Sequence, residues 1–137
     1  MISTKSGIYY ESVEVPSLRT HNTIPPFSSG MIKGSKTSID IIKLIGKKQK
    51  PCIYVGGATH GDELNGVSAI LKLVEDISPS QLNGSLILVP VQNPLGYEYR
   101  ERLNPYDPID PDWVPTDKKA GTYTQRVKHI LGRLLKE

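Results

Sequence analysis

Residues 52–66 read CIYVGGATHGDELNG, and this stretch decides the fold that we expect. Its first part, residues 52–57, is continuously apolar, which is typical of a strand that a sheet buries on both faces. Glycine then recurs up to Gly61, and a helical pattern begins near Asp62. The stretch therefore predicts a strand, a tight loop and a helix in direct succession.

The helix is expected from about Asp62 to Ile77. Apolar residues recur at intervals of three and four along one face of this segment, at Leu64, Val67, Leu71 and Val74. Thr59 and Asp62 have the spacing of a capping box at the helix start. Pro79 is expected to end the helix because proline cannot continue it.

Two more strands are expected on either side of this unit. Residues 39–45 form an apolar run, and residues 85–91 form another after a turn at Asn83-Gly84. A helical crossover makes strands 52–57 and 85–91 parallel. Ligands of such sheets bind beyond the carboxyl ends of the strands, where the loop at 56–62 and the loop after Val91 meet. The expected fold class is α/β, with a partial mixed sheet around a parallel strand–helix–strand unit.

The remaining segments carry weaker patterns. Residues 1–37 are interrupted by proline and glycine, so we expect an irregular N-terminal segment of short extended pieces and turns. Residues 92–121 contain five prolines, which argues against any helix or central strand there. A last helix is expected from Thr122, because Thr122 and Gln125 have capping-box spacing. The 137 residues suit a single domain, 1–137.

Composition excludes several classes of protein. The formal net charge is only +3 and the basic residues are scattered, so we expect no nucleic-acid partner. Cys52 is the only cysteine, which excludes an intrachain disulfide. No apolar run approaches the roughly 20 residues of a membrane span, and no signal-peptide core is visible. We therefore expect a cytoplasmic protein that does not bind membranes.

His60 and Glu63 are the residues in this loop that point to chemistry. They are three residues apart, so both side chains can face the same way, and an imidazole with a carboxylate is a typical zinc pair. Gly61 between them permits close approach of a substrate. Other interpretations stay open at this point: a glycine-rich phosphate cradle without a recognised motif, a Glu63 that complements the helix dipole, or a hydrogen-bonded turn histidine.

The stretch HGDELNG, residues 60–66, resembles the zinc-binding signature of the succinylglutamate desuccinylase and aspartoacylase branch of the zinc carboxypeptidase-like hydrolases. Residues 89–94, VPVQNP, are similar to the strand end and Asn-Pro turn that follow in this family. Arg102, nine residues after Asn93, stands where the family places a substrate-binding arginine, and residues 121–126 look like its next helix start. The likeness spans roughly residues 39–137, and the fold that it implies is the first half of a zinc carboxypeptidase-like α/β/α fold.

The resemblance implies a function and a set of site residues. It implies zinc as the cofactor, with His60 and Glu63 as metal ligands and Arg102 as a catalytic and substrate-binding residue. Asn93 and Arg100 are further substrate-binding candidates, Arg100 being the alternative to Arg102. The implied reaction is hydrolysis of an amide bond next to a carboxylate, in an acyl amino acid or at a peptide end. The alternative is a non-catalytic module that binds a metal or ligand.

Two departures from the family pattern qualify these expectations. The family continues with Asp-Leu-Asn-Arg, whereas this chain reads Asp110-Pro111-Asp112-Trp113, which replaces an amide and a cation. The family's third zinc ligand and its general base would lie beyond Glu137. We therefore expect the N-terminal part of a catalytic domain, incomplete by itself, that associates with itself or with a complementary C-terminal fragment. Three aspartates, Asp107, Asp110 and Asp112, follow the Asn93-Pro94 turn and are candidates for an added ligand.

Overall fold

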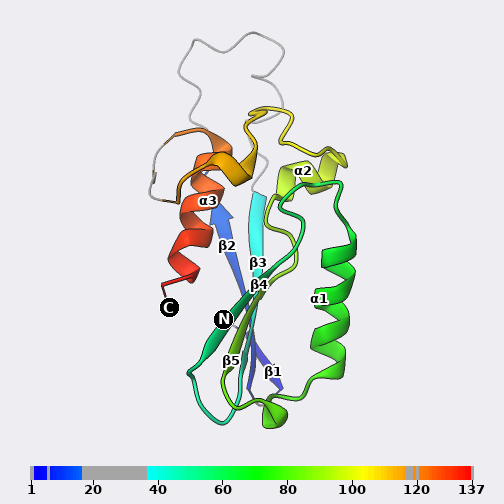
Figure 1. The fold of residues 1–137 in the computed structure, drawn as a ribbon, viewed down its shortest axis with the longest axis vertical. Coiled ribbons are helices and arrows are strands. Elements are labelled where there is room, and N and C mark those ends of the chain that lie inside the picture. Colours follow the sequence, from blue (N-terminus) through cyan, green and yellow to red (C-terminus); the bar gives the residue numbers. More distant parts are fainter. Residues whose placement is uncertain (1, 6, 17–36, 117–118, 120, 137) are drawn as a thin grey trace.

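The computed structural model describes residues 2–5, 7–16, 37–116, 119 and 121–136, and its ribbon is shown in Figure 1. Within these ranges the strands are β1 (Ile2–Lys5), β2 (Ile8–Val15), β3 (Thr37–Ile45), β4 (Cys52–Gly56) and β5 (Ser85–Val89). The α-helices are α1 (Asn65–Asp76), α2 (Pro94–Tyr99) and α3 (Tyr123–Leu134), and two 3-10 turns are η1 (Pro79–Gln81) and η2 (Pro111–Trp113).

The strands form one mixed sheet in the order β1-β2-β3-β5-β4. Strands β4 and β5 are parallel and joined through α1, whereas the other neighbouring pairs are antiparallel. The predicted parallel strand–helix–strand unit and the α/β fold class are therefore confirmed. Helices α1 and α3 lie on opposite sides of the sheet (Figure 1).

Two hydrophobic clusters fill the spaces between the sheet and these helices. Strand β3 serves both, because Ile39 and Ile41 face α3 while Ile42 and Leu44 face α1. Each buried aliphatic side chain contributes about 1.5–3 kcal/mol relative to an exposed one. Alternate side chains of the central strand β3 thus pack toward both helices. The loops at the carboxyl ends of β4 and β5 extend from this packed sheet.

Some expectations about the strands are wrong. Only short extended pieces and turns are predicted over residues 1–37, yet residues 2–5 and 8–15 form the paired strands β1 and β2. The stretch IYYESVEV alternates well enough to pair with β3 along its full length. Residues 17–36 of the same N-terminal segment lie outside the described residues. Strand β4 was expected to be buried on both faces, but it is the edge strand, and Ile53 is 56% exposed.

The helix expectations have mixed outcomes. Helix α1 begins at Asn65, later than expected, and its N-cap Leu64 makes no side-chain capping bond in the described chain, so the capping box at Thr59 and Asp62 is wrong. Helix α2 was not expected, but Pro94 occupies its first turn, where proline needs no N–H partner. The start of α3 is confirmed, with a complete capping box between Thr122 and Gln125. None of the helices in the described ranges is long and apolar enough to cross a membrane.

Candidate metal centre

The loop that carries His60 continues from the carboxyl end of β4. Its first residues extend the pairing of the parallel strands, because Gly57 N donates to Val89 O at 2.9 Å and Gln92 N donates to Gly57 O at 2.9 Å. Asn93 N then donates to Ala58 O at 3.1 Å. Main-chain hydrogen bonds therefore hold this loop against the end of β5 and the residues that follow it. The two loops meet at the carboxyl ends of the parallel strands, as predicted.

A chain of side-chain hydrogen bonds braces the same loop. The Tyr54 hydroxyl donates to Gln92 Oε1 at 2.8 Å, and Gln92 Nε2 donates to Thr59 Oγ1 at 2.8 Å. Burial raises the pKa of Tyr54 to about 12, so this hydroxyl keeps its proton at neutral pH. The sequence analysis did not predict these hydrogen bonds. The available signal was that a polar residue follows each of the paired strands, Thr59 after β4 and Gln92 after β5.

Gly61 allows the loop to lie directly against α2. A Cβ atom at this position would collide with the backbone of Gly96 and Tyr97, and Gly61 N donates to Arg102 O at 3.2 Å. The glycine had been expected to make room for a substrate. In the structure the close neighbour is protein backbone, so its role is to bring the loop against α2 and the segment that carries Arg102.

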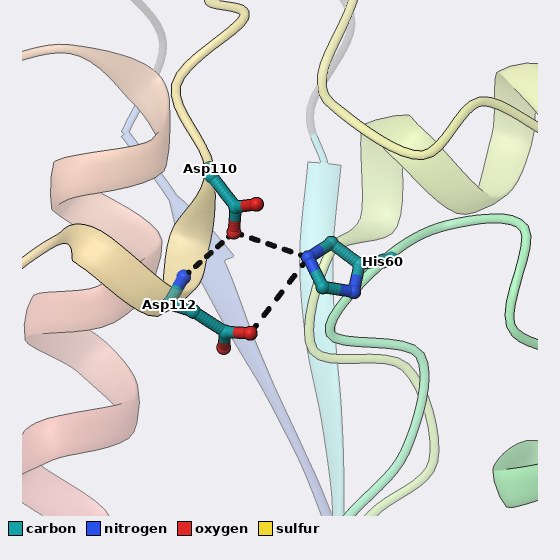
Figure 2. Close-up of side chains that lie close together, drawn as sticks. All are labelled: His60, Asp110 and Asp112. Carbon is teal, nitrogen blue, oxygen red and sulfur yellow. Dashed lines mark hydrogen bonds and ion pairs between the residues drawn. The ribbon is translucent and has the colours of Figure 1, made fainter.

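His60 is buried, with 5% of its surface exposed, and a carboxylate approaches each of its ring nitrogens. Nδ1 lies 3.1 Å from Glu63 Oε1. On the other side of the ring, Nε2 lies 3.1 Å from Asp110 Oδ1 and 3.9 Å from Asp112 Oδ2, as Figure 2 shows. His60 and Glu63 therefore converge as expected, although both lie in the loop before α1 and not in the helix.

Arg102 reaches the same cluster from the segment after α2. Its Nη1 donates to Glu63 Oε1 at 3.1 Å, and its Nη2 lies 3.9 Å from Asp110 Oδ2. The Arg102 side chain is 54% exposed, so one side of the guanidinium faces solvent. Arg102 therefore lies beside His60 while remaining partly exposed, and its role in substrate binding stays a prediction.

These contacts shift the proton equilibria of the cluster. Burial lowers the pKa of His60 and is the largest single influence, but hydrogen bonds to Asp110 and Glu63 together outweigh it, so the pKa lies above 6.5. The pKa of Asp110 is lowered from 3.8, first by the backbone N–H of Asp112 and then by His60. Protonated His60 is thus stabilised by its hydrogen bonds to Asp110 and Glu63.

The other candidate residues serve the surrounding structure. Asn93 is buried and caps α2, with its Oδ1 accepting from Gly96 N, while its Nδ2 has no partner among the described residues. Arg100 is the exposed residue that ends α2, with a left-handed φ of 56°. Asp107 accepts from Thr124 N at 2.7 Å and so holds the start of α3, which removes it from the candidate ligands.

The donor atoms on the Glu63 side suit a zinc ion. Two ligands of a tetrahedral zinc ion lie about 3.4 Å apart when each bond is about 2.1 Å long. The 3.1 Å between His60 Nδ1 and Glu63 Oε1 is close to this separation. Asp110 on Nε2 then resembles the carboxylate that commonly accepts the second ring N–H of a metal-bound histidine. The residues present therefore fit the metal that the resemblance implies.

Comparison with known proteins finds relatives of this region. A model of the succinylglutamate desuccinylase/aspartoacylase catalytic domain matches residues 49–110, which run from just before β4 to Asp110. This stretch of the chain is similar to the catalytic domain of that family. The match contains His60, Glu63 and Arg102, and it ends at the carboxylate that bonds to the His60 ring. The matched region therefore includes His60, Glu63, Arg102 and Asp110, while Asp112 lies just beyond it.

Individual relatives agree with the family match. An N-alpha-acetyl-L-2,4-diaminobutyric acid deacetylase from Halomonas elongata is 28% identical over 92 residues, which cover 61% of this chain and 27% of that protein. A succinylglutamate desuccinylase/aspartoacylase structure from Rhodobacter sphaeroides aligns with a TM-score of 0.72 and 25% identity, over 91% of this chain and 35% of that one.

A succinylglutamate desuccinylase structure from Silicibacter sp. TM1040 shares the fold, with a TM-score of 0.76, 23% identity, and coverage of 94% of this chain and 36% of that one. Almost the whole chain therefore aligns with about a third of each solved structure. The chain spans 27% of the curated relative.

Proposed function

We propose that the chain contributes the N-terminal part of a zinc-dependent hydrolase that cleaves amide bonds next to a carboxylate. The class includes N-acyl amino acid deacylases and carboxypeptidase-like enzymes. The observation that carries the proposal is the convergence of His60 Nδ1 and Glu63 Oε1, 3.1 Å apart, beside the partly exposed Arg102 guanidinium. The family match and the deacetylase relative support the amide-hydrolase class.

His60 and Glu63 would hold the zinc ion through Nδ1 and a carboxylate oxygen. A bound zinc ion lowers the pKa of its water and polarises a carbonyl group. Asp110 accepts the Nε2 proton of His60, which fixes the tautomer that leaves Nδ1 free for the metal. These residues supply two of the three protein ligands of a usual catalytic zinc site, so we propose that the chain by itself is a poor catalyst.

Arg102 would bind the carboxylate of the substrate. A guanidinium can hold a carboxylate through two parallel hydrogen bonds, and Arg102 has one exposed side available for this. Arg100 is the alternative cation two residues away, on the exposed end of α2. Asn93 would offer its Nδ2 protons, which have no partner among the described residues. The proposed ligand is therefore a small acyl amino acid or a peptide end.

A hydrolysis screen tests this proposal. N-acetyl and N-succinyl amino acids are offered to the zinc-loaded 137-residue chain and to any longer natural product of its gene. We expect turnover in the longer form that is lost in His60→Gln. Absence of turnover in every form with all substrates, while zinc remains bound, would contradict the hydrolase proposal.

A non-catalytic binding module is the second candidate function. It is favoured by Trp113, which is 85% exposed, and by Asp112, because the resemblance places an arginine and an amide at these positions. Such a module would bind acyl amino acids or zinc without turnover. The same screen, combined with a binding measurement for N-acetyl amino acids, separates the two candidates.

Two broader proposals concern location and association. We propose a cytoplasmic location, since Cys52 is the sole cysteine and the fold needs no disulfide. We also propose that the edge of β4 pairs with a second copy of the chain or with a complementary C-terminal fragment. An open strand edge presents unpaired main-chain groups that favour such pairing.

A further inference from the structure

A cavity lies on the α1 side of the sheet, away from the residues of the candidate metal centre. Its volume is about 770 Å³, and residues from β2, β3, α1 and α2 line it. In Figure 1, α2 lies above the N-terminal end of α1, and both helices contribute to the walls of the cavity. None of His60, Glu63 and Arg102 contributes to its lining. The cavity is therefore separate from the candidate metal centre.

The register of the strands places polar and apolar side chains together on this face of the sheet. In the antiparallel pair of β2 and β3, Tyr10 lies opposite Ile42, and Ser12 lies opposite Asp40. Opposite residues share one face of a sheet, and so do Asp40 and Ile42, which are two residues apart. Ile42 packs in the cluster on the α1 side, so all four side chains project toward that side. The floor of the cavity therefore combines a carboxylate and a hydroxyl with an aromatic and an aliphatic side chain.

Large apolar side chains converge on this cavity while remaining exposed. Tyr10 is 39% exposed, Tyr97 of α2 is 40% exposed and Leu71 of α1 is 49% exposed, and all three line the cavity. Val67, one helical turn before Leu71, is buried and also lines it. Exposed apolar side chains that gather at one place mark a binding site, whereas scattered ones are ordinary. The volume and the mostly apolar walls match those of small-molecule sites.

The ionisable groups that line the cavity are acidic. Among the described residues, the lining contains Asp40 and Glu11 but no lysine, arginine or histidine. The Glu11 carboxylate lies 3.6 Å from Lys43 Nζ and is therefore already paired. The Asp40 side chain is exposed and makes no hydrogen bond or ion pair within the described part of the chain. The cavity thus presents an uncompensated negative charge beside apolar walls, which complements a ligand with one positive charge and a hydrocarbon body.

We propose that this cavity binds a small organic ammonium ion with an apolar or aromatic body. The ammonium group donates hydrogen bonds to the Asp40 carboxylate, and such charge-assisted bonds are stronger than neutral ones. The rings of Tyr10 and Tyr97 pack against the cation and the adjoining hydrocarbon, while Val67 and Leu71 cover the apolar body. Two helices and the sheet bound the cavity on three sides, which favours a compact molecule over an extended chain. This binding function is independent of the proposed hydrolysis.

Ligand titration of the 137-residue chain, followed by ¹H–¹⁵N NMR, tests the proposal with probes of similar shape and different charge. The probes are phenethylamine, which is a cation at neutral pH, the neutral phenethyl alcohol and the anion phenylacetate. We expect the amine to bind with a Kd of about 1 mM or lower, as suits a ligand of this size. It should bind about fivefold more tightly than the alcohol, and the anion should bind most weakly. The amide signals of Asp40, Leu71 and Tyr97 should shift on binding.

Three variants separate the charge of the cavity from its apolar wall. Asp40→Asn should weaken amine binding about fivefold and leave alcohol binding unchanged. Glu75→Gln removes the same charge from an exposed residue of α1 outside the cavity, so it should change neither affinity. Leu71→Ala should weaken the binding of both the amine and the alcohol, because it shortens the apolar wall. Circular dichroism checks that each variant folds.

Several results would overturn the proposal. They are an amine that binds no more tightly than the alcohol, an undiminished amine affinity in Asp40→Asn, and signal shifts confined to residues outside the cavity. A further contrary result is that the signals of the cavity shift with protein concentration alone and not with the amine. That result would assign the cavity to contact with a second copy of the chain.

Discussion

At the scale of single residues, His60 is held between carboxylates on both ring nitrogens. Glu63 and Asp110 each lie 3.1 Å from one nitrogen, and the ring itself is almost fully buried. A buried imidazole with both nitrogens engaged has one orientation available to it. The orientation therefore does not depend on a metal ion, and a metal would meet a ring that is already positioned.

The raised pKa of His60 predicts a pH-dependent stability. Without metal, the folded chain binds the His60 proton more tightly than the unfolded chain, whose histidine titrates near 6.5. The stabilisation is therefore complete below about pH 6.5 and is lost as pH rises through the raised pKa. We expect the Tm difference between wild type and His60→Gln to be larger at pH 5.5 than at pH 8.5.

Thermal melts for this comparison are run in EDTA, because a divalent ion would compete with the proton for the same nitrogens. The range stays above pH 5 because the pKa of Asp110 is lowered from 3.8 and its carboxylate remains ionised there. A Tm difference that grows toward alkaline pH would show that burial, and not the two carboxylates, dominates the protonation of His60.

Arg102 is predicted to act on the substrate and not on the metal. In any active form of the protein, Arg102→Ala should lower kcat/KM for acyl amino acids by about tenfold to a hundredfold, the value of one or two charge-assisted hydrogen bonds. Zinc stoichiometry should be unchanged. Arg102→Lys keeps the positive charge but lacks the planar guanidinium, so its kcat/KM should lie between the values of wild type and Arg102→Ala. Equal kinetics in all three proteins would remove Arg102 from the site.

At the scale of elements, the contact between the His60 loop and α2 positions the site. Gly61→Ala would drive a Cβ atom into the backbone of Gly96. We expect a loss of about 1–3 kcal/mol in the free energy of unfolding, measured by urea denaturation, together with weaker zinc binding. Preserved stability and zinc affinity in Gly61→Ala would show that this contact is dispensable.

Gly66→Ala is the matched control for that variant. Gly66 lies in the first turn of α1, and a Cβ atom there would make only ordinary contacts, the nearest at 3.4 Å from Gly57 Cα. Alanine in a helix is favoured over glycine by about 0.5–1 kcal/mol. We therefore expect this variant to be as stable as wild type or more stable, with zinc binding intact.

The exposed edge of β4 is the second element with a predicted behaviour. Ile53 is 56% exposed on this edge strand, and sedimentation velocity at increasing concentration should show association. Ile53→Lys should reduce it, because lysine on an edge strand opposes pairing. Leu71→Lys, on the 49% exposed Leu71 of α1, should leave it unchanged. A wild type that stays monomeric at all concentrations would contradict the proposed pairing.

At the scale of the whole molecule, the strand–helix–strand unit could be predicted because its signals are local. The apolar runs around Ile53 and Leu88 and the helical spacing around Ile70 each fall within one element. Helix α2 is not predicted because a high density of prolines argues against a helix, whereas Pro94 occupies the first turn of one. The edge position of β4 was missed as well, since composition does not reveal which strands flank a sheet.

In the candidate site, only the contact between residues that are close in the sequence could be predicted from the sequence. His60 and Glu63 are close in sequence, so their convergence follows from their spacing. Asp110 meets His60 across 50 residues, and Arg102 meets Glu63 across 39. These contacts depend on the close approach of Gly61 to α2 and on the capped turn at Asp110, which no sequence pattern reports. The resemblance supplied Arg102, while Asp110 and Asp112 were considered only as added ligands.

Zinc binding by the intact 137-residue chain, measured with and without His60, tests the central claim that His60 organises a metal centre. The chain is stripped of metal and titrated with zinc by calorimetry, and His60→Gln is titrated in parallel after its fold has been verified by circular dichroism. His60 is a ligand of the proposed zinc ion, so the account predicts one zinc ion per wild-type chain and loss of that binding in the variant. A wild type that binds no zinc, or a folded His60→Gln variant that binds it equally well, would contradict the account.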